Sequence, residues 1–337
     1  MTVAPAPLLE LRGVSKRFVR RPDAAGRIAR ALGARVADST VRAVEGVELA
    51  VREREVVGLV GESGCGKSTL GRMVARVIEP SEGERYWKGR PYRDLQRGAD
   101  RRERLAVQMI FQDPYASLNP RMRVAEIVGE AAVVHGFTDA AHRDAYVAGI
   151  LERVGMDASL MRRFPHQFSG GQRSRIGIAR ALAVKPQFLV CDEAVAALDV
   201  SVQAQVINLF MRLRAELGLS YLFISHDLGV VRHLSDRLVV MYLGRVVESG
   251  PTAEVYARPN HPYTEALVAE IPRVHARHRS YIPIRGEIPS PLAPPPGCHF
   301  HPRCPKAFAR CVSEAPELRE IAPGRHAACH LNDSPSR

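Results

Sequence analysis

The stretch GESGCGKST, residues 61–69, decides the fold of this chain. It fits the pattern G-x-x-x-x-G-K-[ST], with Gly61, Gly66, Lys67 and Ser68 in the defining positions. The apolar run at residues 55–60 predicts a buried strand before it, and residues 70–80 predict a helix after it that stops at a proline. A strand, a glycine-rich loop and a helix in this order are the context of a phosphate-binding loop. A glycine-rich turn with a chance lysine would not explain both flanks.

Backbone N–H groups of such a loop surround an anion, and the N-terminus of the following helix adds its positive end. Lys67 is expected to reach the β- and γ-phosphates of a nucleotide, and the Ser68 hydroxyl to bind Mg²⁺. We therefore predict a nucleotide site formed by Gly61, Ser63, Gly64, Cys65, Gly66, Lys67, Ser68 and Thr69.

A second half of the site is predicted at FLVCDE, residues 188–193, where four apolar residues end in two acids. This pattern indicates a buried strand that delivers carboxylates at its C-terminal end. Asp192 is expected to hold Mg²⁺, directly or through water, and Glu193 to polarise the water that attacks the γ-phosphate. The alternative is a strand that merely ends in solvated acids, which the phosphate-binding loop disfavours.

Between the two halves lies FSGGQRSR, residues 168–175, followed by a long helical pattern. Ser169, Gly170 and Gly171 offer N–H groups for a second anion. One chain with one nucleotide does not need two such loops. The second loop makes sense if it serves the nucleotide of another subunit.

The composition is that of an ordinary globular protein, with 46% hydrophobic and 25% charged residues among 337. This length is sufficient for two domains. No run approaches 18 apolar residues, and the N-terminus lacks the pattern of a secretory signal, so we expect a cytoplasmic protein. The net charge of +12 is compatible with a solvated surface, with an anionic membrane surface or with nucleic acid.

Apolar runs separate the chain into regions of different predicted structure. Residues 8–60 favour strands around a polar insertion at 20–40 that we expect to be partly helical, and residues 113–165 favour helices. Strands alternate with helices over residues 188–250, which predicts a mostly parallel sheet. Prolines concentrate after Gly250 and predict a loop-rich appendage.

The S-G-G-Q motif between the two nucleotide motifs resembles the signature of ABC-type ATPases. Gln112 in VQMIFQDP matches the Q-loop of that family, Asp199 in AALD the D-loop, and His226 in FISHD the H-loop. Phe18 in KRF matches the aromatic residue that stacks on adenine. Over nearly the whole chain, the sequence is similar to the F-type ATP-binding subunit of bacterial dipeptide and oligopeptide importers, on the segments GESGCGKSTLGR, FQDPYASLNPR, SHDLGVV, MYLGRVVESG, HPYTEAL and PPGCHF.

The resemblance implies an α/β fold of the ABC-type P-loop NTPases, with a RecA-like core, an antiparallel β subdomain and an α-helical signature subdomain. It places the ATPase domain at residues 1–255, with the helical subdomain at about 113–175, and a proline- and cysteine-rich extension at 256–337. It also implies ATP hydrolysis by a chain bound peripherally at the cytoplasmic side of the cell membrane. The implied partners are a second ABC ATPase subunit in a heterodimer, two integral membrane permease subunits and an extracytoplasmic solute-binding protein.

The family mechanism implies roles for individual residues. Each ATP lies between the phosphate-binding loop of one subunit and the signature residues of the other, here Ser169, Gly170, Gly171 and Gln172. Gln112 senses Mg²⁺ and the γ-phosphate, and His226 holds the γ-phosphate and orients Glu193. Asp199 serves communication between the subunits.

Three motifs depart from the family pattern without removing a catalytic group. Ala194 stands where the family usually has proline after the paired acids. Ala196 replaces the serine of S-A-L-D, and Ser174 replaces the second glutamine of S-G-G-Q-R-Q-R.

Four of the six cysteines fall near the C-terminus, at Cys298, Cys304, Cys311 and Cys329. In a reducing cytosol such a group favours a metal over disulfides. The spacings lack the tight C-x2-4-C pairs of zinc sites. The similar tails of peptide importers imply a [4Fe–4S] cluster, with Zn²⁺ and unligated cysteines as the alternatives.

Two other functions remain open. An importer of nickel or another small solute would use the same type of ATPase. An ABC ATPase that acts on nucleic acid is favoured by the net charge and the cysteine group, but such proteins usually interrupt the core with long insertions. Only 56 residues lie between Gln112 and Ser169, so we expect no nucleic-acid partner.

Overall fold

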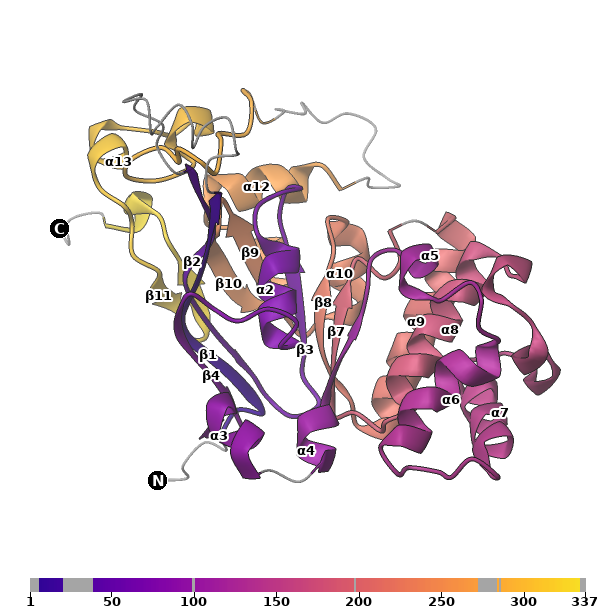
Figure 1. The fold of residues 1–337 in the computed structure, drawn as a ribbon. Coiled ribbons are helices and arrows are strands. Elements are labelled where there is room, and N and C mark those ends of the chain that lie inside the picture. The colour runs from indigo at the N-terminus through magenta and orange to yellow at the C-terminus, as the bar shows by residue number, and fades with distance from the viewer. Residues whose placement is uncertain are drawn as a thin grey trace, which may run out of the picture.

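The structure is a computed structural model, which describes residues 6–20, 39–98, 101–196, 198–271, 284 and 286–333. Two sheets organise this α/β fold (Figure 1). A four-stranded sheet has the strand order β2-β1-β4-β5, and an eight-stranded sheet has the order β11-β12-β10-β9-β3-β8-β7-β6. A helical lobe lies beside the larger sheet, on the right of Figure 1.

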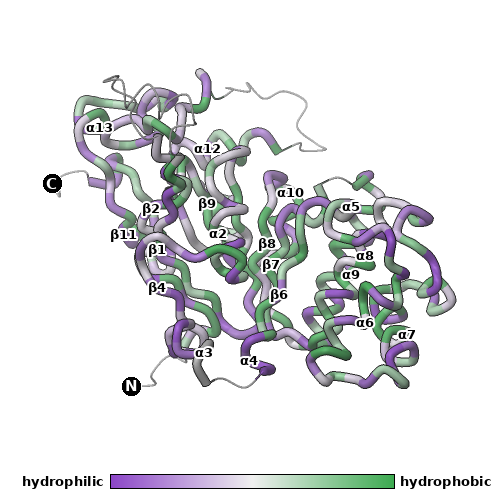
Figure 2. The backbone as a smooth tube through the Cα atoms, in the orientation of Figure 1, coloured by the Kyte–Doolittle hydropathy of each residue, from purple (hydrophilic) through white to green (hydrophobic). Residues whose placement is uncertain are grey.

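The centre of the larger sheet is parallel, as the alternation of strands and helices predicts. It contains β6 (Val107–Ile110), β7 (Phe188–Asp192), β8 (Ser220–Ile224), β3 (Val56–Val60) and β9 (Arg237–Tyr242). Every residue of β3, β7 and β8 is buried, because both faces of the sheet are covered. These strands form the hydrophobic centre of the molecule in Figure 2.

Alternate residues of the central strands enter two separate cores. Leu189, Tyr221 and Phe223 pack into the core shared with the helical lobe. Val190, Leu222 and Ile224 pack into the core that contains α2 and the smaller sheet. The side-chain period of two thus joins the two halves of the molecule through one sheet.

Helix α2 (Lys67–Val74) begins earlier and ends earlier than the predicted helix at residues 70–80. Gly66 has a φ of 105°, which only glycine adopts without strain, and this lets the loop turn directly into the helix. Arg76, with a φ of 61°, has left the helical conformation, so the helix stops well before Pro80.

The smaller sheet is antiparallel and combines β1 (Leu9–Arg20), β2 (Ser39–Val51), β4 (Glu82–Trp87) and β5 (Arg90–Pro91). The sequence predicted the first two as a β-rich start. The helical character expected for the insertion at 20–40 falls largely on residues 21–38, which lie outside the described part of the chain. Two short helices, α3 (Tyr92–Gly98) and α4 (Arg101–Leu105), precede β6.

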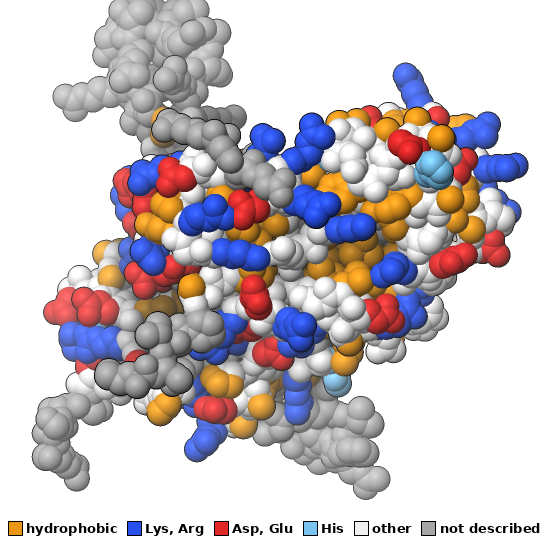
Figure 3. All heavy atoms as spheres, turned by 90° about the horizontal axis from the view of Figure 1, so that it is seen from below, with side chains coloured by type: hydrophobic (Ala, Val, Ile, Leu, Met, Phe, Trp, Pro, Cys, Tyr) orange, Lys and Arg blue, Asp and Glu red, His pale blue; other side chains and the backbone are white. Residues whose placement is uncertain are grey.

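The helical lobe comprises α5 (Pro114–Ser117), α6 (Val124–Val134), α7 (Arg143–Arg153), two 3-10 turns at 158–167 and α8 (Gly170–Leu182). The helices α9 (Val200–Leu217) and α10 (Leu228–Leu234) follow in the chain. Figure 3 views the molecule from below and shows hydrophobic side chains gathered on the side of this lobe. Among the described helices, none is both long and apolar enough to cross a bilayer.

The C-terminal segment (residues 286–333) is mostly loop, as predicted, and also contains short helices and two strands. After β10 (Arg245–Pro251), α11 (Thr252–Ala257) and α12 (Pro262–Ala269), the chain forms α13 (Ala309–Ser313), two 3-10 turns and the strands β11 (Arg319–Ala322) and β12 (Arg325–Ala327). β12 pairs with β10 and so extends the larger sheet. Pro323 lies in the turn between β11 and β12, where its missing N–H breaks no ladder.

Candidate functional site

The phosphate-binding loop (residues 61–69) follows β3 and runs into the first turn of α2, as the motif predicts. A Cβ at Gly61 would lie 2.2 Å from the Met241 carbonyl oxygen, and one at Gly66 would lie 2.1 Å from that of Ala43. The backbone of the loop therefore packs directly on neighbouring backbone, which leaves no space for side chains there.

Lys67 is buried and folds back over the loop that it follows. Its Nζ donates to the carbonyl oxygens of Gly61 and Glu62, at 2.7 and 2.9 Å. An ammonium group at this position lies inside the loop whose glycines permit close approach of an anion. Phosphate oxygens can replace these two carbonyls as its acceptors.

Ser68 and Asp192 meet although they are far apart in the chain. The Ser68 hydroxyl donates to Asp192 Oδ1 at 2.8 Å. Burial raises the pKa of Asp192, and the hydrogen bond from Ser68 opposes that shift. A hydroxyl and a carboxylate beside a phosphate-binding loop are oxygen ligands of the kind that Mg²⁺ prefers.

Glu193 lies at the meeting point of three predicted motifs. Its Oε2 accepts a hydrogen bond from Gln112 Nε2 at 2.7 Å, and its Oε1 lies 3.5 Å from His226 Nδ1. The backbone of Glu193 has a φ of 47°, an uncommon conformation for a residue other than glycine, directly after β7. The turn aims the carboxylate away from the strand and toward the two partners.

Other predicted residues of the loop differ in what they expose. Ser63 and Gly64 are exposed, while Gly66, Ser68 and Thr69 are partly buried. Cys65 is buried, and burial raises the pKa of its thiol. Its side chain is turned inward, and its backbone N–H donates to the Glu62 carbonyl oxygen at 3.3 Å.

The signature residues cap α8. Ser169 Oγ accepts from the Gln172 N–H at 3.4 Å, and Gln172 Oε1 accepts from the Ser169 N–H at 3.1 Å, which is a capping box. Gly171 lies against Val202 of α9, where a Cβ would come within 2.3 Å of that side chain. The N-terminus of α8 is thus held in place by its own residues.

Asp199 and Phe18 lie on the surface. Asp199 is the exposed N-cap of α9. Phe18 is 44% exposed on β1, with Lys16 Nζ 5.4 Å from its ring centroid. Both are accessible to a ligand or a second chain.

Sequence reasoning missed Glu62 and its partners. The Glu62 carboxylate accepts from Arg303 Nη1 and Nη2 at 2.6 and 2.9 Å, and the Glu62 N–H donates to the Tyr263 hydroxyl at 2.7 Å. An acidic residue inside an anion-binding loop is a signal that a cation lies nearby. The sequence could not tell which of the many arginines supplies it.

The four C-terminal cysteines meet around one small cavity, the cysteine cavity, of about 10 Å³ (Cys298, Cys304, Cys311 and Cys329). All four thiols are free. Burial raises the pKa of Cys298, Cys304 and Cys329, and the other thiols of the group add to the rise. Among the residues with described positions, no three His, Cys, Asp or Glu side chains are placed to hold one metal ion.

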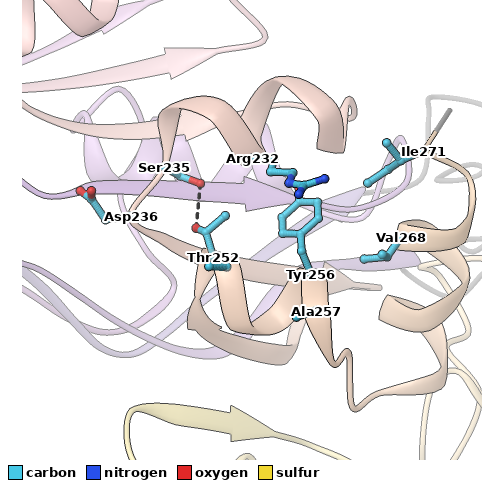
Figure 4. A pocket seen from close by; sticks show the side chains of 9 residues that line it. Arg232, Ser235, Asp236, Thr252, Tyr256, Ala257, Val268 and Ile271 are labelled. Atoms are coloured by element: carbon cyan, nitrogen blue, oxygen red, sulfur yellow. Dashed lines mark hydrogen bonds between the residues drawn. The ribbon is translucent and has the colours of Figure 1, made fainter. Parts of the chain in front are cut away.

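A cavity of about 730 Å³ lies apart from these motifs (Figure 4). Arg232 and Tyr256 lie on one side of it, with the guanidinium 5.7 Å from the ring centroid. On another side of the cavity, the hydroxyls of Ser235 and Thr252 form a hydrogen bond of 3.0 Å. None of its described lining residues belongs to a predicted motif.

Comparison with known proteins identifies the family. Residues 44–196 match the ABC transporter family model, and residues 247–311 match the C-terminal region of oligopeptide/dipeptide transporters. The chain is 48% identical over 328 residues to the oligopeptide transport ATP-binding protein AppF of Bacillus subtilis, covering 96% of this chain and 97% of that protein. The chain belongs to the ABC transporter family of ATPases.

A further relative and a solved structure support the same family and fold. This ABC ATPase is 51% identical over 296 residues to the putative oligopeptide transport ATP-binding protein YkfD of Bacillus subtilis, covering 87% of this chain and 90% of that one. Among solved structures, it resembles the dimeric ATP-binding cassette MJ0796 bound to ADP and phosphate, with a TM-score of 0.61 and 25% identity. That match covers 72% of this chain and 98% of the other. The ABC ATPase fold predicted from the sequence is confirmed.

Proposed function

We propose that this ABC ATPase powers the import of di- or oligopeptides across a membrane. The observation that carries the proposal is the match of residues 247–311 to the C-terminal region of oligopeptide/dipeptide transporters, because that segment lies mostly outside the ATP-binding core. Two relatives that match over almost the full chain are described as an oligopeptide transport ATP-binding protein and a putative peptide import ATP-binding protein.

The described contacts support a division of roles within the ATPase site. Lys67 binds the β- and γ-phosphates, while Ser68, Asp192 and Gln112 would hold Mg²⁺, which neutralises charge on the phosphates. Glu193 polarises the attacking water, and His226 keeps its carboxylate in position. Phe18 stacks on the adenine from the smaller sheet.

A second ATPase subunit completes the site in this proposal. The exposed Ser169 stands at the N-terminus of α8, where the helix presents free N–H groups to an anion. We infer that the signature residues, from Ser169 to Gln172, bind the γ-phosphate of ATP held by the partner, and that the exposed Asp199 lies at the same interface. The dimer of the similar cassette MJ0796 supports this arrangement.

The remaining partners are two permease subunits and an extracytoplasmic solute-binding protein, with the ATPase attached peripherally at the cytoplasmic side. Exposed hydrophobic side chains next to Gln112 support contact with a permease, since Phe111 is 37% and Tyr115 66% exposed. Closure of the ATPase pair would move this segment with the helical lobe.

We further propose that the four C-terminal cysteines hold a [4Fe–4S] cluster. The four thiols line one cavity, which supports this donor set, and burial raises the pKa of Cys329, with the other three thiols adding to the rise. Bound iron would lower that pKa by coordinating the thiolates. Zinc is the alternative that metal analysis distinguishes.

Reconstitution tests the transport function. The ATPase is co-expressed with its permease and second ATPase subunits and placed in liposomes with the solute-binding protein. With the solute-binding protein and peptide outside the liposomes and the ATPase and ATP enclosed in the lumen, we expect di- or oligopeptides to stimulate ATP hydrolysis and to accumulate in the lumen. Stimulation by Ni²⁺ instead of peptides, or by nucleic acid without the permeases, would contradict the proposal.

A further inference from the structure

An ion pair joins the phosphate-binding loop to the C-terminal segment. Both oxygens of the Glu62 carboxylate are bound by Arg303, and the Arg303 side chain is only 5% exposed. Glu62 is the second residue of a loop built to receive phosphates. Without a cation beside it, its carboxylate would repel the nucleotide.

Arg303 is held in place by a group of aromatic side chains. The Tyr242 hydroxyl lies 3.4 Å from Arg303 Nη1, and the Tyr242 ring lies 4.8 Å from that of Tyr263. Phe300, which is fully buried, packs against both rings. Since Tyr263 also accepts the Glu62 N–H, the same group fixes the backbone and the side chain of Glu62.

Arg303 is carried by a short turn that begins and ends at the cysteine cavity. Residues 301–303 form a single 3-10 turn, directly before Cys304. The Cys304 N–H donates to the His301 carbonyl at 3.2 Å, and His301 Nδ1 bonds the Cys298 carbonyl at 2.9 Å. Backbone groups of Cys298 and Cys304 therefore fix both ends of the turn that positions the guanidinium.

We propose that Arg303 is a positioning residue that neutralises Glu62, so that the C-terminal segment sets the affinity of the ATPase for nucleotide. The charge on Glu62 is compensated only while the 298–304 turn holds Arg303 against the loop. This inference rests on the nucleotide site and is independent of the substrate that is transported.

Calorimetric titration with Mg–ADP tests the inference without hydrolysis. We expect Arg303→Gln to raise the Kd about tenfold, a typical strength of coupling between sites. Glu62→Gln/Arg303→Gln should return the Kd to near the unsubstituted value, because no unpaired carboxylate remains. Arg310→Gln is the matched control, since Arg310 also lies in the C-terminal segment and pairs with Glu314 and Asp333 at its surface.

Steady-state kinetics separates positioning from catalysis. With Arg303→Gln we expect the KM for ATP to rise while kcat at saturating ATP stays within about twofold. Glu62→Gln, which keeps Arg303, should bind Mg–ADP as tightly as the unsubstituted protein or more tightly. Because Glu62→Gln should leave the Kd unchanged or lower it, this variant tests the inference even if Arg303→Gln folds poorly.

Two results would overturn the inference. One is an Arg303→Gln variant that folds and binds Mg–ADP with an unchanged Kd. The other is a Glu62→Gln variant that loses affinity as Arg303→Gln does, because the pair would then be a structural contact alone. Lys67→Ala distinguishes a failure of this inference from a failure of the nucleotide site. Unchanged Mg–ADP binding in that variant would contradict the nucleotide site itself.

Discussion

The two carboxylate oxygens of Glu193 have different partners. One accepts a hydrogen bond from Gln112, and the other lies near His226 Nδ1. This geometry predicts that Glu193→Gln retains ATP binding, which depends on Lys67 and the loop, but loses turnover. General-base losses are commonly of order 10² to 10⁴ in rate. The measurement is phosphate release at saturating ATP, together with direct nucleotide titration.

Glu216→Gln is a suitable control for this substitution. Glu216 is a half-exposed carboxylate on α9 with a surface partner, Arg212. It should leave hydrolysis unchanged. A Glu193→Gln enzyme that hydrolyses ATP within a few-fold of the unsubstituted rate would show that another group is the base.

Two contacts between side chains show what the sequence could predict and what it could not. Ser68 and Asp192 were predicted to share a metal, since each belongs to a motif of known spacing, and they do meet at 2.8 Å. The pair of Glu62 and Arg303 joins positions 241 residues apart, and although Glu62 signals that a cation lies nearby, no local pattern identifies Arg303 as that cation. Contacts set by tertiary packing between distant segments are outside the reach of local sequence reasoning.

Helix α8 presents the signature residues at its N-terminus, which predicts the effect of a bulky cation there. Ser169→Arg should leave ATP bound to its own loop and block closure over the ATP of the partner, because the side chain fills the space where the γ-phosphate would approach. In the assembled transporter, we expect hydrolysis at the partner's site to fall by at least about tenfold.

The matched substitution is Ser159→Arg, at an exposed serine of the same lobe. It adds the same charge and bulk away from the helix terminus and should leave hydrolysis intact. Normal hydrolysis by Ser169→Arg in the full transporter would rule out the shared site.

The turn that carries Cys304 predicts a coupled loss of metal and structure. If the four cysteines ligate one [4Fe–4S] cluster, Cys304→Ser should lower the iron content of anaerobically purified protein from about four per chain and loosen the C-terminal segment. Elemental analysis measures the first effect, and limited proteolysis the second.

Cys65→Ser and Cys191→Ser are the internal controls, since both lie within the nucleotide motifs. Neither should change the metal content. Protein that has never met oxygen and contains neither iron nor zinc at near-stoichiometric amounts would contradict both forms of the proposal.

At the element scale, prediction succeeded where one segment carries its own signal. β3, β7 and β8 are continuous apolar runs, and a strand buried on both faces requires that pattern. β12 is only three residues long and pairs with β10 from a distant part of the chain. Its proline-rich surroundings pointed to loops, because the pairing that stabilises it is not local.

The stability of the molecule depends in part on a buried ion pair between β10 and β12 of the larger sheet. Glu248 of β10 is fully buried and bonded by Arg325 Nη2 at 3.2 Å, and it also accepts the N–H groups of Asn260 and His261. Arg325→Met should reduce the free energy of unfolding by about 3–5 kcal/mol, because it leaves a buried charge without its cation. Denaturant unfolding measures the loss.

Arg310→Met gives the comparison, because Arg310 is 42% exposed and its ion pairs lie at the surface. Such pairs contribute roughly 0–1 kcal/mol. An equal loss in the free energy of unfolding in the two variants would show that the buried Arg325 pair stabilises the protein no more than a surface pair does.

Because β12 follows every nucleotide motif in the chain, the ribosome completes the whole ATP-binding machinery before the strand that covers β10 exists. A nonsense mutation between residues 252 and 318 would yield a chain with all of those motifs and an open sheet edge at Glu248 and Ser249. Unpaired strand edges recruit other strands. We expect such a chain to be recovered in inclusion bodies, and its genetic phenotype to be that of a null allele.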